Sequence, residues 1–455
     1  MATSSSTFTR FLLGTCAFLL ILIYNNAAFA VPAFSRQTGM ECAACHVGSF
    51  GPQLTNFGRQ FKLNGYVWGE VKSLTKGLSA MAYGGFEHTN TDLRKGIELT
   101  GNQERFGTNN DFTIDQASLF YAGKLTSNIG MMAQFTYSSP RESYSWDNLD
   151  LRFADNTTVS GKSLVYGVSV NNNPSVQDVW QSTPTWRFPY LASGLAPTPA
   201  ASPYIENLAQ KVLGTGAYAL FNDWVYAELS GYSSLSDDFQ RQVGIQDSEI
   251  SDHLSGLAPY WRLAIQHEFG QNYASFGTYG LDANRFPGND RTSGTDNMLD
   301  YALDATYQYH TDDGKHFVSV YGSLLRELQK LDATFAEGGS SNAQNHLTEA
   351  RINASYYFNN EYGITLGRFM IDGSADSLLY SSPTNSKPDS AGWTIQLDFT
   401  PFGTAKSPLY PNFNQRFFIQ YTAYDKFDGE SHNYDGTGRN ASDNDTLYIG
   451  DWIAF

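Results

Sequence analysis

Two thiols and an imidazole stand close together near the start of the sequence, in the run Cys42-Ala43-Ala44-Cys45-His46. Thiols at this spacing can add to the two vinyl groups of one haem, and a histidine directly after the second thiol then serves as an axial ligand of the iron. We therefore predict one covalently attached haem c. Cys42 and Cys45 attach it, and His46 is the proximal ligand.

Two other uses of these residues fit less well. A zinc site would need further thiol or imidazole ligands, and residues 47–80 contain neither a histidine nor a second CxxC. A redox-active dithiol would leave His46 without a role and lacks the expected strand-helix-strand setting. The remaining cysteine, Cys16, lies in a segment that we expect to be removed, so no structural disulfide is predicted.

The sixth ligand of the iron is left open by the sequence. Met40 lies two residues before Cys42, and placing it on the opposite face of the haem would require a sharp reversal of the chain. Met81 and His88 are alternatives from farther along the chain, and an open sixth position fits equally well.

The first part of the chain indicates export. Residues 1–30 carry one charge, Arg10, followed by an apolar run over residues 11–24 and then Ala28-Phe29-Ala30. This order is typical of a cleaved signal peptide, and the apolar run is shorter than the roughly 20 residues that a membrane-spanning helix needs. We assign residues 1–30 to the signal peptide and residues 31–76 to a small monohaem cytochrome c plug.

After residue 76 the apolar residues repeat with a period of two. Leu299, Tyr301 and Leu303 alternate with Asp300 and Asp304, as expected for strands with lipid on one side and water on the other. Sixteen such segments occur, near residues 79–88, 112–125, 129–139, 147–154, 162–171, 210–220, 224–233, 259–267, 272–281, 299–309, 315–328, 347–358, 361–371, 391–400, 414–424 and 445–455.

These strands predict an all-β fold, an outer-membrane antiparallel β-barrel of about 16 strands over residues 77–455. Every second connection is short, which suits periplasmic turns opposite longer extracellular loops, with both termini in the periplasm. The terminal Phe455, preceded by Ile453 and Gly450, resembles the closing-strand signal of outer-membrane proteins. A soluble β-sandwich explains neither feature. We therefore place the protein in the bacterial outer membrane, with outer-membrane lipid around it.

The composition restricts the partners. Acidic residues outnumber basic ones, for a net charge of −16, which excludes nucleic acid as a partner. One expected outer loop contains five acids and a histidine: Asp237, Asp238, Asp247, Glu249, Asp252 and His253. These residues form either oxygen ligands for ferrous iron or an ordinary solvated surface. The sequence favours the solvated surface.

The run from Pro32 to Tyr66, including the CxxCH and Gln53-Leu54-Thr55-Asn56-Phe57-Gly58-Arg59-Gln60-Phe61, resembles the fused monohaem cytochrome-porins of iron-oxidising bacteria. The resemblance implies haem attachment by Cys42, Cys45 and His46. It also implies a haem pocket shaped by the residues Arg36, Gln37, Arg59 and Tyr66.

The resemblance further implies electron transfer from an extracellular donor, with ferrous iron favoured, to a periplasmic c-type cytochrome or another soluble carrier. That activity would make the protein an oxidoreductase whose catalysis needs no general base. The alternative is a solute-diffusion porin with a structural or sensory haem plug. A haem peroxidase or ligand sensor is a third class, but residues 31–76 offer no histidine besides His46 for acid-base work. Neither the direction of electron flow nor the oligomeric state follows from the sequence.

Overall fold

The computed structural model describes residues 33–70, 74–183, 187–247, 250, 252–380 and 382–455. The signal peptide predicted for residues 1–30 lies outside these ranges. Within them, no helix has both the length and the apolar character needed to cross a membrane.

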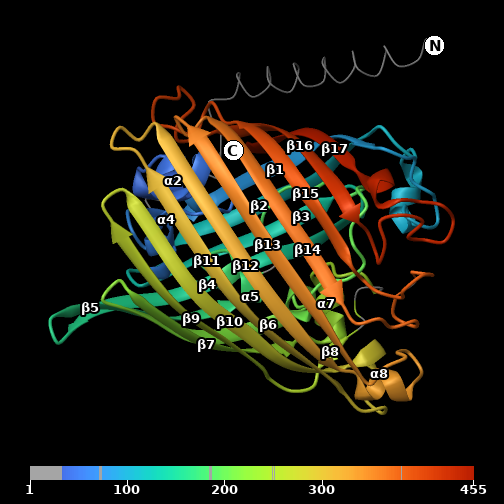
Figure 1. Cartoon of the computed structure of the whole chain (residues 1–455). Coiled ribbons are helices and arrows are strands. Elements are labelled where there is room, and N and C mark those ends of the chain that lie inside the picture. The colour runs from blue at the N-terminus through green and yellow to red at the C-terminus, as the bar shows by residue number, and fades with distance from the viewer. Residues whose placement is uncertain (1–32, 71–73, 184–186, 248–249, 251, 381) are drawn as a thin grey trace, which may run out of the picture.

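One antiparallel sheet closes on itself to form a barrel (Figure 1). Strand β1 (Leu78–Thr89) pairs with β2 (Asp111–Lys124) on one side and with β17 (Thr446–Ala454) on the other, which closes the ring. The sheet has 17 strands, but β8 (His253–Leu254) is only two residues long and lies beside β10. Sixteen long strands therefore form the wall, and the predicted antiparallel barrel is confirmed.

The other strands of the wall are β3 (Ile129–Ser138), β4 (Ser143–Val159), β5 (Lys162–Asn171), β6 (Val212–Phe221), β7 (Val225–Ser234), β9 (Ala258–Phe269), β10 (Asn272–Phe286), β11 (Asp296–His310), β12 (His316–Lys330), β13 (Gln344–Phe358), β14 (Tyr362–Gly373), β15 (Ser390–Phe399) and β16 (Asn414–Lys426). The described helices are α2 (Ala33–Thr38), α3 (Cys42–Cys45), η1 (Val47–Ser49), α4 (Asn56–Leu63), η2 (Leu74–Gly77), η3 (Gly101–Arg105), α5 (Pro174–Gln177), α6 (Tyr204–Asn207), α7 (Asp237–Gln242), η5 (Pro287–Asn289), α8 (Asp332–Ala336) and η6 (Ala441–Asn444).

Strand β11 shows why these segments form a barrel wall. Tyr301 and Leu303 are 45 % and 49 % exposed on the outer surface, whereas Asp300 and Asp304 on the same strand are buried in the lumen. An apolar outer face over many strands is stable only against lipid or another apolar surface, and the polar inner face needs partners inside. The period-two pattern therefore sets which way each strand faces.

The two ends of the barrel differ in the length of their connections. Short turns join β2 to β3, β4 to β5, β6 to β7, β9 to β10, β11 to β12 and β13 to β14. Most connections at the opposite end are longer and carry the helices η3, α7 and α8. We call the end with the short turns the turn end and the opposite end the loop end. The chain enters β1 and leaves β17 at the turn end, where Phe455 and Ala80 exchange backbone hydrogen bonds.

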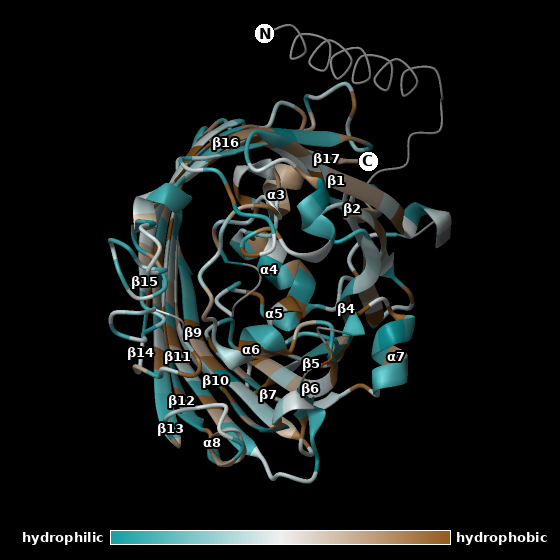
Figure 2. Ribbon diagram, turned by 90° about the vertical axis from the view of Figure 1, so that its right-hand side faces the viewer, coloured by the Kyte–Doolittle hydropathy of each residue, from teal (hydrophilic) through white to brown (hydrophobic). Residues whose placement is uncertain are grey.

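Two segments occupy the lumen, as the view along the barrel shows (Figure 2). The N-terminal segment, residues 33–70, contributes α2, α3 and α4 from the turn end. The inner loop, residues 172–211 between β5 and β6, contributes α5 and α6, and most of its described residues up to Leu191 are buried. The lumen is therefore packed with protein from both segments.

The two segments touch each other inside the barrel. Lys62 of α4 is buried and donates from Nζ to the backbone carbonyls of Val176 and Asp178 in the inner loop. The backbone N–H of Leu54 donates to the side chain of Gln181 at 3.2 Å. Because buried polar groups need hydrogen-bond partners, each segment stabilises the other where they meet.

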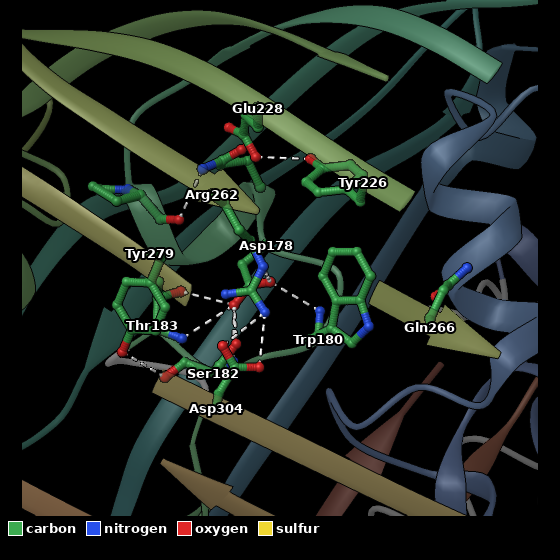
Figure 3. A network of polar contacts seen from close by, with 12 residues as sticks. Asp178, Trp180, Ser182, Thr183, Tyr226, Glu228, Arg262, Gln266, Tyr279 and Asp304 are labelled. Carbon is green, nitrogen blue, oxygen red and sulfur yellow. Dashed lines mark hydrogen bonds and ion pairs between the residues drawn. The ribbon is translucent and has the colours of Figure 1, made fainter. Parts of the chain in front are cut away.

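The inner loop is held against the wall by a charged network (Figure 3). Asp178 accepts hydrogen bonds from the backbone N–H groups of Ser182 and Thr183 at 2.8 and 3.1 Å, which fixes the bend after α5. Arg262 of β9 pairs with Asp304 at 2.9 Å and lies 4.8 Å from the Trp180 ring. A buried arginine between two acids is well compensated, so the loop has a defined seat in the lumen.

Candidate functional site

The two thiols and the histidine lie on a single tight turn at the turn end. Cys42 and Cys45 form the first and last residues of α3, and the backbone N–H of His46 donates to the Cys42 carbonyl at 2.8 Å. Both cysteines are free and half-buried. The turn therefore brings both sulfur atoms and the imidazole to one short stretch of backbone, as predicted.

Helix α4 packs directly on this turn. The hydroxyl of Thr55 donates to the Ala44 carbonyl at 2.6 Å, and the Thr55 backbone N–H donates to the Cys45 carbonyl at 3.0 Å. Thr55 also caps α4 by accepting from the Gly58 N–H at 3.2 Å. A Cβ on Gly58 would lie only 2.2 Å from the Cys45 carbonyl oxygen, so this close approach requires glycine.

The residue His46 is half-buried as a whole. Its Nδ1 is buried and has no hydrogen-bond partner among the described residues. Burial, with the positive charge of Arg416 nearby, lowers the pKa of His46 to about 4. Burial likewise raises the pKa of the Cys42 thiol to about 11 and that of the Cys45 thiol to about 12. At neutral pH the site thus holds two protonated thiols and a neutral imidazole.

These residues fit a covalent haem. The thiols are unpaired and half-buried, and a neutral imidazole is the form that binds a metal. A buried ring nitrogen without a partner is the kind of polar atom that a ligand or its surroundings would satisfy. In the part of the chain that the structure describes, no group of three or more His, Cys, Asp or Glu side chains is arranged to hold a metal ion.

The three candidates for the sixth ligand lie in different surroundings. Met40 is 38 % exposed just before the turn. Met81 lies in the lumen, where its sulfur accepts a hydrogen bond from the Trp452 indole at 3.2 Å. His88 lies roughly 20 Å beyond Met81 along β1, at about 3.3 Å per residue, and forms a hydrogen bond with Asn110 near the loop end. Distance along the strand disfavours His88, while Met40 and Met81 remain open.

The four residues expected to shape the pocket each anchor the N-terminal segment. Arg36 donates to the carbonyls of Lys76 and Leu78, and Gln37 donates to the carbonyls of Tyr66 and Trp68. Arg59 donates to Gln308 of β11 at 3.0 Å and lies 3.8 Å from the Tyr273 ring. Tyr66 donates to Asp150 of β4 at 2.6 Å. Their observed contacts hold the segment in place, and a direct role toward haem stays a prediction.

Wall residues complete the site, and no sequence pattern predicted them. Arg416 of β16 donates to the Gly48 carbonyl at 2.9 Å, and Asn414 donates to the Ser49 carbonyl at 2.7 Å. Phe50 packs edge-on against Trp452 with ring centroids 4.7 Å apart. These partners are separated from the haem motif by more than 350 residues of sequence, so only the closed barrel brings them together.

Among the described residues of the acidic outer loop, the acids are engaged in ion pairs. His253 pairs with Asp237 at 2.6 Å, Arg241 pairs with Asp238 and Asp247, and Asp252 pairs with Arg285. Glu249 lies outside the described residues. The acids that are described already have partners, which favours the solvated-surface interpretation.

No known protein-family model matches the sequence. No characterised protein matches it by sequence comparison. Among solved structures, similar chains include the outer-membrane protein OmpT of Vibrio cholerae, with 9 % identity, a TM-score of 0.41, and coverage of 83 % of this chain and 96 % of that one.

Two further similar structures are channel proteins. The outer-membrane channel DcaP of Acinetobacter baumannii is 11 % identical, with a TM-score of 0.44 and coverage of 83 % of this chain and 96 % of that one. The anion-selective porin from Comamonas acidovorans is 10 % identical, with a TM-score of 0.41 and coverage of 83 % and 99 %.

Proposed function

We propose that the protein is an outer-membrane c-type cytochrome fused to a porin-like barrel. One covalent haem moves electrons between an extracellular donor, with ferrous iron favoured, and periplasmic carriers. The family resemblance of residues 32–66 motivates the choice of donor. The apolar outer face of the barrel supports a membrane location. The position of the haem motif in the lumen supports electron transfer through the barrel.

The single observation that carries the proposal is the position of the CxxCH turn. It lies on a segment that enters the barrel from the turn end, and the lumen behind it is packed by α4 and the inner loop. A packed lumen hinders solutes, whereas an electron needs no open path. A haem on this turn would stand at the periplasmic mouth, if the short turns face the periplasm.

The chain's own residues have separate tasks in this proposal. Cys42 and Cys45 hold the haem by thioether bonds, and His46 binds the iron; the haem supplies one-electron redox chemistry when bound. Arg416 and Asn414 fix the backbone that follows His46, so they set the direction of the imidazole. Phe50 and Trp452 pack beside this backbone and exclude water from it.

The partners follow from the two ends of the barrel. A soluble electron carrier would approach the turn end, where α3 is half-buried. The extracellular donor would approach the loop end. Lipid would surround the apolar outer face.

The test uses the full chain purified in detergent from a host that matures c-type cytochromes. We expect covalent haem in the wild type and none in the Cys42→Ser/Cys45→Ser double variant, which keeps the same barrel. We also expect anoxic ferrous iron to reduce the haem. In proteoliposomes, ferrous iron outside should reduce a trapped electron acceptor only with the wild type. Absence of covalent haem from the folded wild type would refute the proposal, and reduction by dithionite but not by ferrous iron would remove iron as donor.

A solute-diffusion porin is the second candidate, because one observation favours it. A cleft of about 540 Å³ lies between α4 and the wall at the turn end, lined mainly by polar side chains: Asn56, Gln60, Asn222, Asp223, Trp224, Gln266, His267, Glu268 and Tyr273. A polar cleft beside the N-terminal segment is a feature that a solute path would need. This candidate predicts leakage of small solutes from the same proteoliposomes, in the wild type and the double variant alike.

A further inference from the structure

Two acids face each other across β1 and β2 near the loop end. Glu87 of β1 is paired directly with Asp111 of β2 in the antiparallel register. Thr113 and Asp115 follow Asp111 at alternate positions of β2, so their side chains lie on the same lumenal face. Like charges directly opposite each other destabilise a strand pair, so this placement calls for an explanation.

Glu87 has no partner that would compensate its charge. Glu87 is 1 % exposed, and both of its carboxylate oxygens lack a hydrogen-bond partner among the described residues. No lysine, arginine or histidine in those ranges forms an ion pair with Glu87, Asp111 or Asp115. Asp304, another buried acid of the lumen, instead pairs with Arg262.

The two neighbouring aspartates are each only partly engaged by neutral donors. Asp111 is half-buried and accepts from the Gly107 backbone N–H at 3.1 Å. Asp115 accepts from the Gly194 backbone N–H at 2.7 Å and from the Tyr448 hydroxyl. Because Asp111 is half-buried, the pair of carboxylates can be reached from the loops on the Asp111 side. On the Glu87 side it is buried.

An ionised carboxylate buried without a partner is costly, so such a group either takes up a proton or is matched by a counter-ion or a metal. We propose that Glu87 and Asp111 together bind one divalent cation at the loop end of the lumen. Carboxylate oxygens suit hard and borderline cations, including Mg²⁺, Ca²⁺, Mn²⁺ and Fe²⁺. Two carboxylates leave several positions for water, so the bound ion keeps part of its hydration shell.

The proposed cation site also concerns the extracellular electron donor. If the loop end faces the outside, Glu87 and Asp111 lie where an extracellular cation first meets the lumen. This second step rests on the proposed function: the site would hold ferrous iron while its electron leaves toward the haem. In that step the bound Fe²⁺ would lose one electron and leave the site as Fe³⁺, and the electron would pass to the haem that Cys42, Cys45 and His46 would hold.

The first experiment measures binding without reference to haem. The full chain in detergent is stripped with a chelator and titrated with Mn²⁺, and free Mn²⁺ is counted by electron paramagnetic resonance. We expect one saturable site in the wild type and at least tenfold weaker binding in Glu87→Gln and in Asp111→Asn. Glu337→Gln, which removes an exposed acid from a connection at the same end, is the matched control and should bind like the wild type.

The outcomes separate the site from its role. Absence of a saturable site in the wild type, or unchanged binding in both folded variants, overturns the proposal; if Glu87→Gln does not fold, Asp111→Asn decides alone. The second measurement is the rate at which ferrous iron reduces the haem, with and without excess Ca²⁺. We expect at least a tenfold lower rate in Glu87→Gln. An unchanged rate overturns the assignment to ferrous iron. Mn²⁺ binding in a wild type whose haem ferrous iron does not reduce removes iron as the donor and leaves the cation site standing, whereas Mn²⁺ binding in a folded wild type without covalent haem refutes the proposed function alone.

Discussion

Replacing Gly58 by alanine tests whether the contact between α3 and α4 is built for a glycine. Gly58 lies in the first turns of α4, where alanine ordinarily stabilises a helix by about 1 kcal/mol relative to glycine. The new Cβ, however, would lie 2.2 Å from the Cys45 carbonyl oxygen and 3.0 Å from its carbon. The two helices must therefore separate by about 1 Å to restore ordinary contact.

The magnitude follows from these opposing effects. Overpacking of this kind costs about 1–3 kcal/mol, and the gain in helix propensity offsets about 1 kcal/mol of it. We expect a net loss of up to about 2 kcal/mol in the local stability of the segment, which corresponds to an increase of up to roughly 30-fold in its open population.

Hydrogen exchange measures this population directly. The Thr55 N–H, which donates to the Cys45 carbonyl, should exchange faster in Gly58→Ala by this factor. Gly322→Ala is the control, since its Cβ would meet only the Arg351 carbonyl oxygen at 3.7 Å. Equal or slower exchange of the Thr55 N–H in Gly58→Ala would show that helix propensity outweighs the contact and that the close approach is not needed.

Three further results are expected. Burial lowers the pKa of Lys62 to about 7 from 10.5, so between these pH values the unfolded segment binds one more proton than the folded segment. In the wild type, protection of the α4 amides against hydrogen exchange should therefore rise with pH across that window. Lys62→Met should abolish this pH dependence. Tyr66→Phe should destabilise the segment by about 1–3 kcal/mol in chemical denaturation, because Asp150 loses a buried hydrogen bond, and an unchanged midpoint would count against this anchor. Arg416→Met should leave the Gly48 carbonyl unsatisfied and shift the reduction potential or spectrum of the haem without preventing its attachment, whereas an unaltered spectrum would show that Arg416 does not position His46.

The barrel could be predicted from local sequence patterns alone. Alternation such as Tyr301 and Leu303 against Asp300 and Asp304 depends only on the extended backbone, in which neighbouring side chains point to opposite faces. The number of strands and the alternation of short and long connections follow from counting such segments, so both agree with the structure. The spacing of Cys42, Cys45 and His46 is equally local, because one helical turn brings these residues together.

Only the tertiary structure decided what stands inside the barrel. The inward side of each strand is known from the sequence, but which inward residues meet depends on the register of sixteen strands and on how the N-terminal segment and the inner loop fold into the lumen. Arg416 reaches Gly48, and Lys62 reaches Val176, through contacts that no local pattern specifies. The surroundings of Glu87 are decided in the same way: among the described residues its carboxylate has no hydrogen-bond partner, and this depends on how the lumen packs around β1 and not on the sequence of the strand.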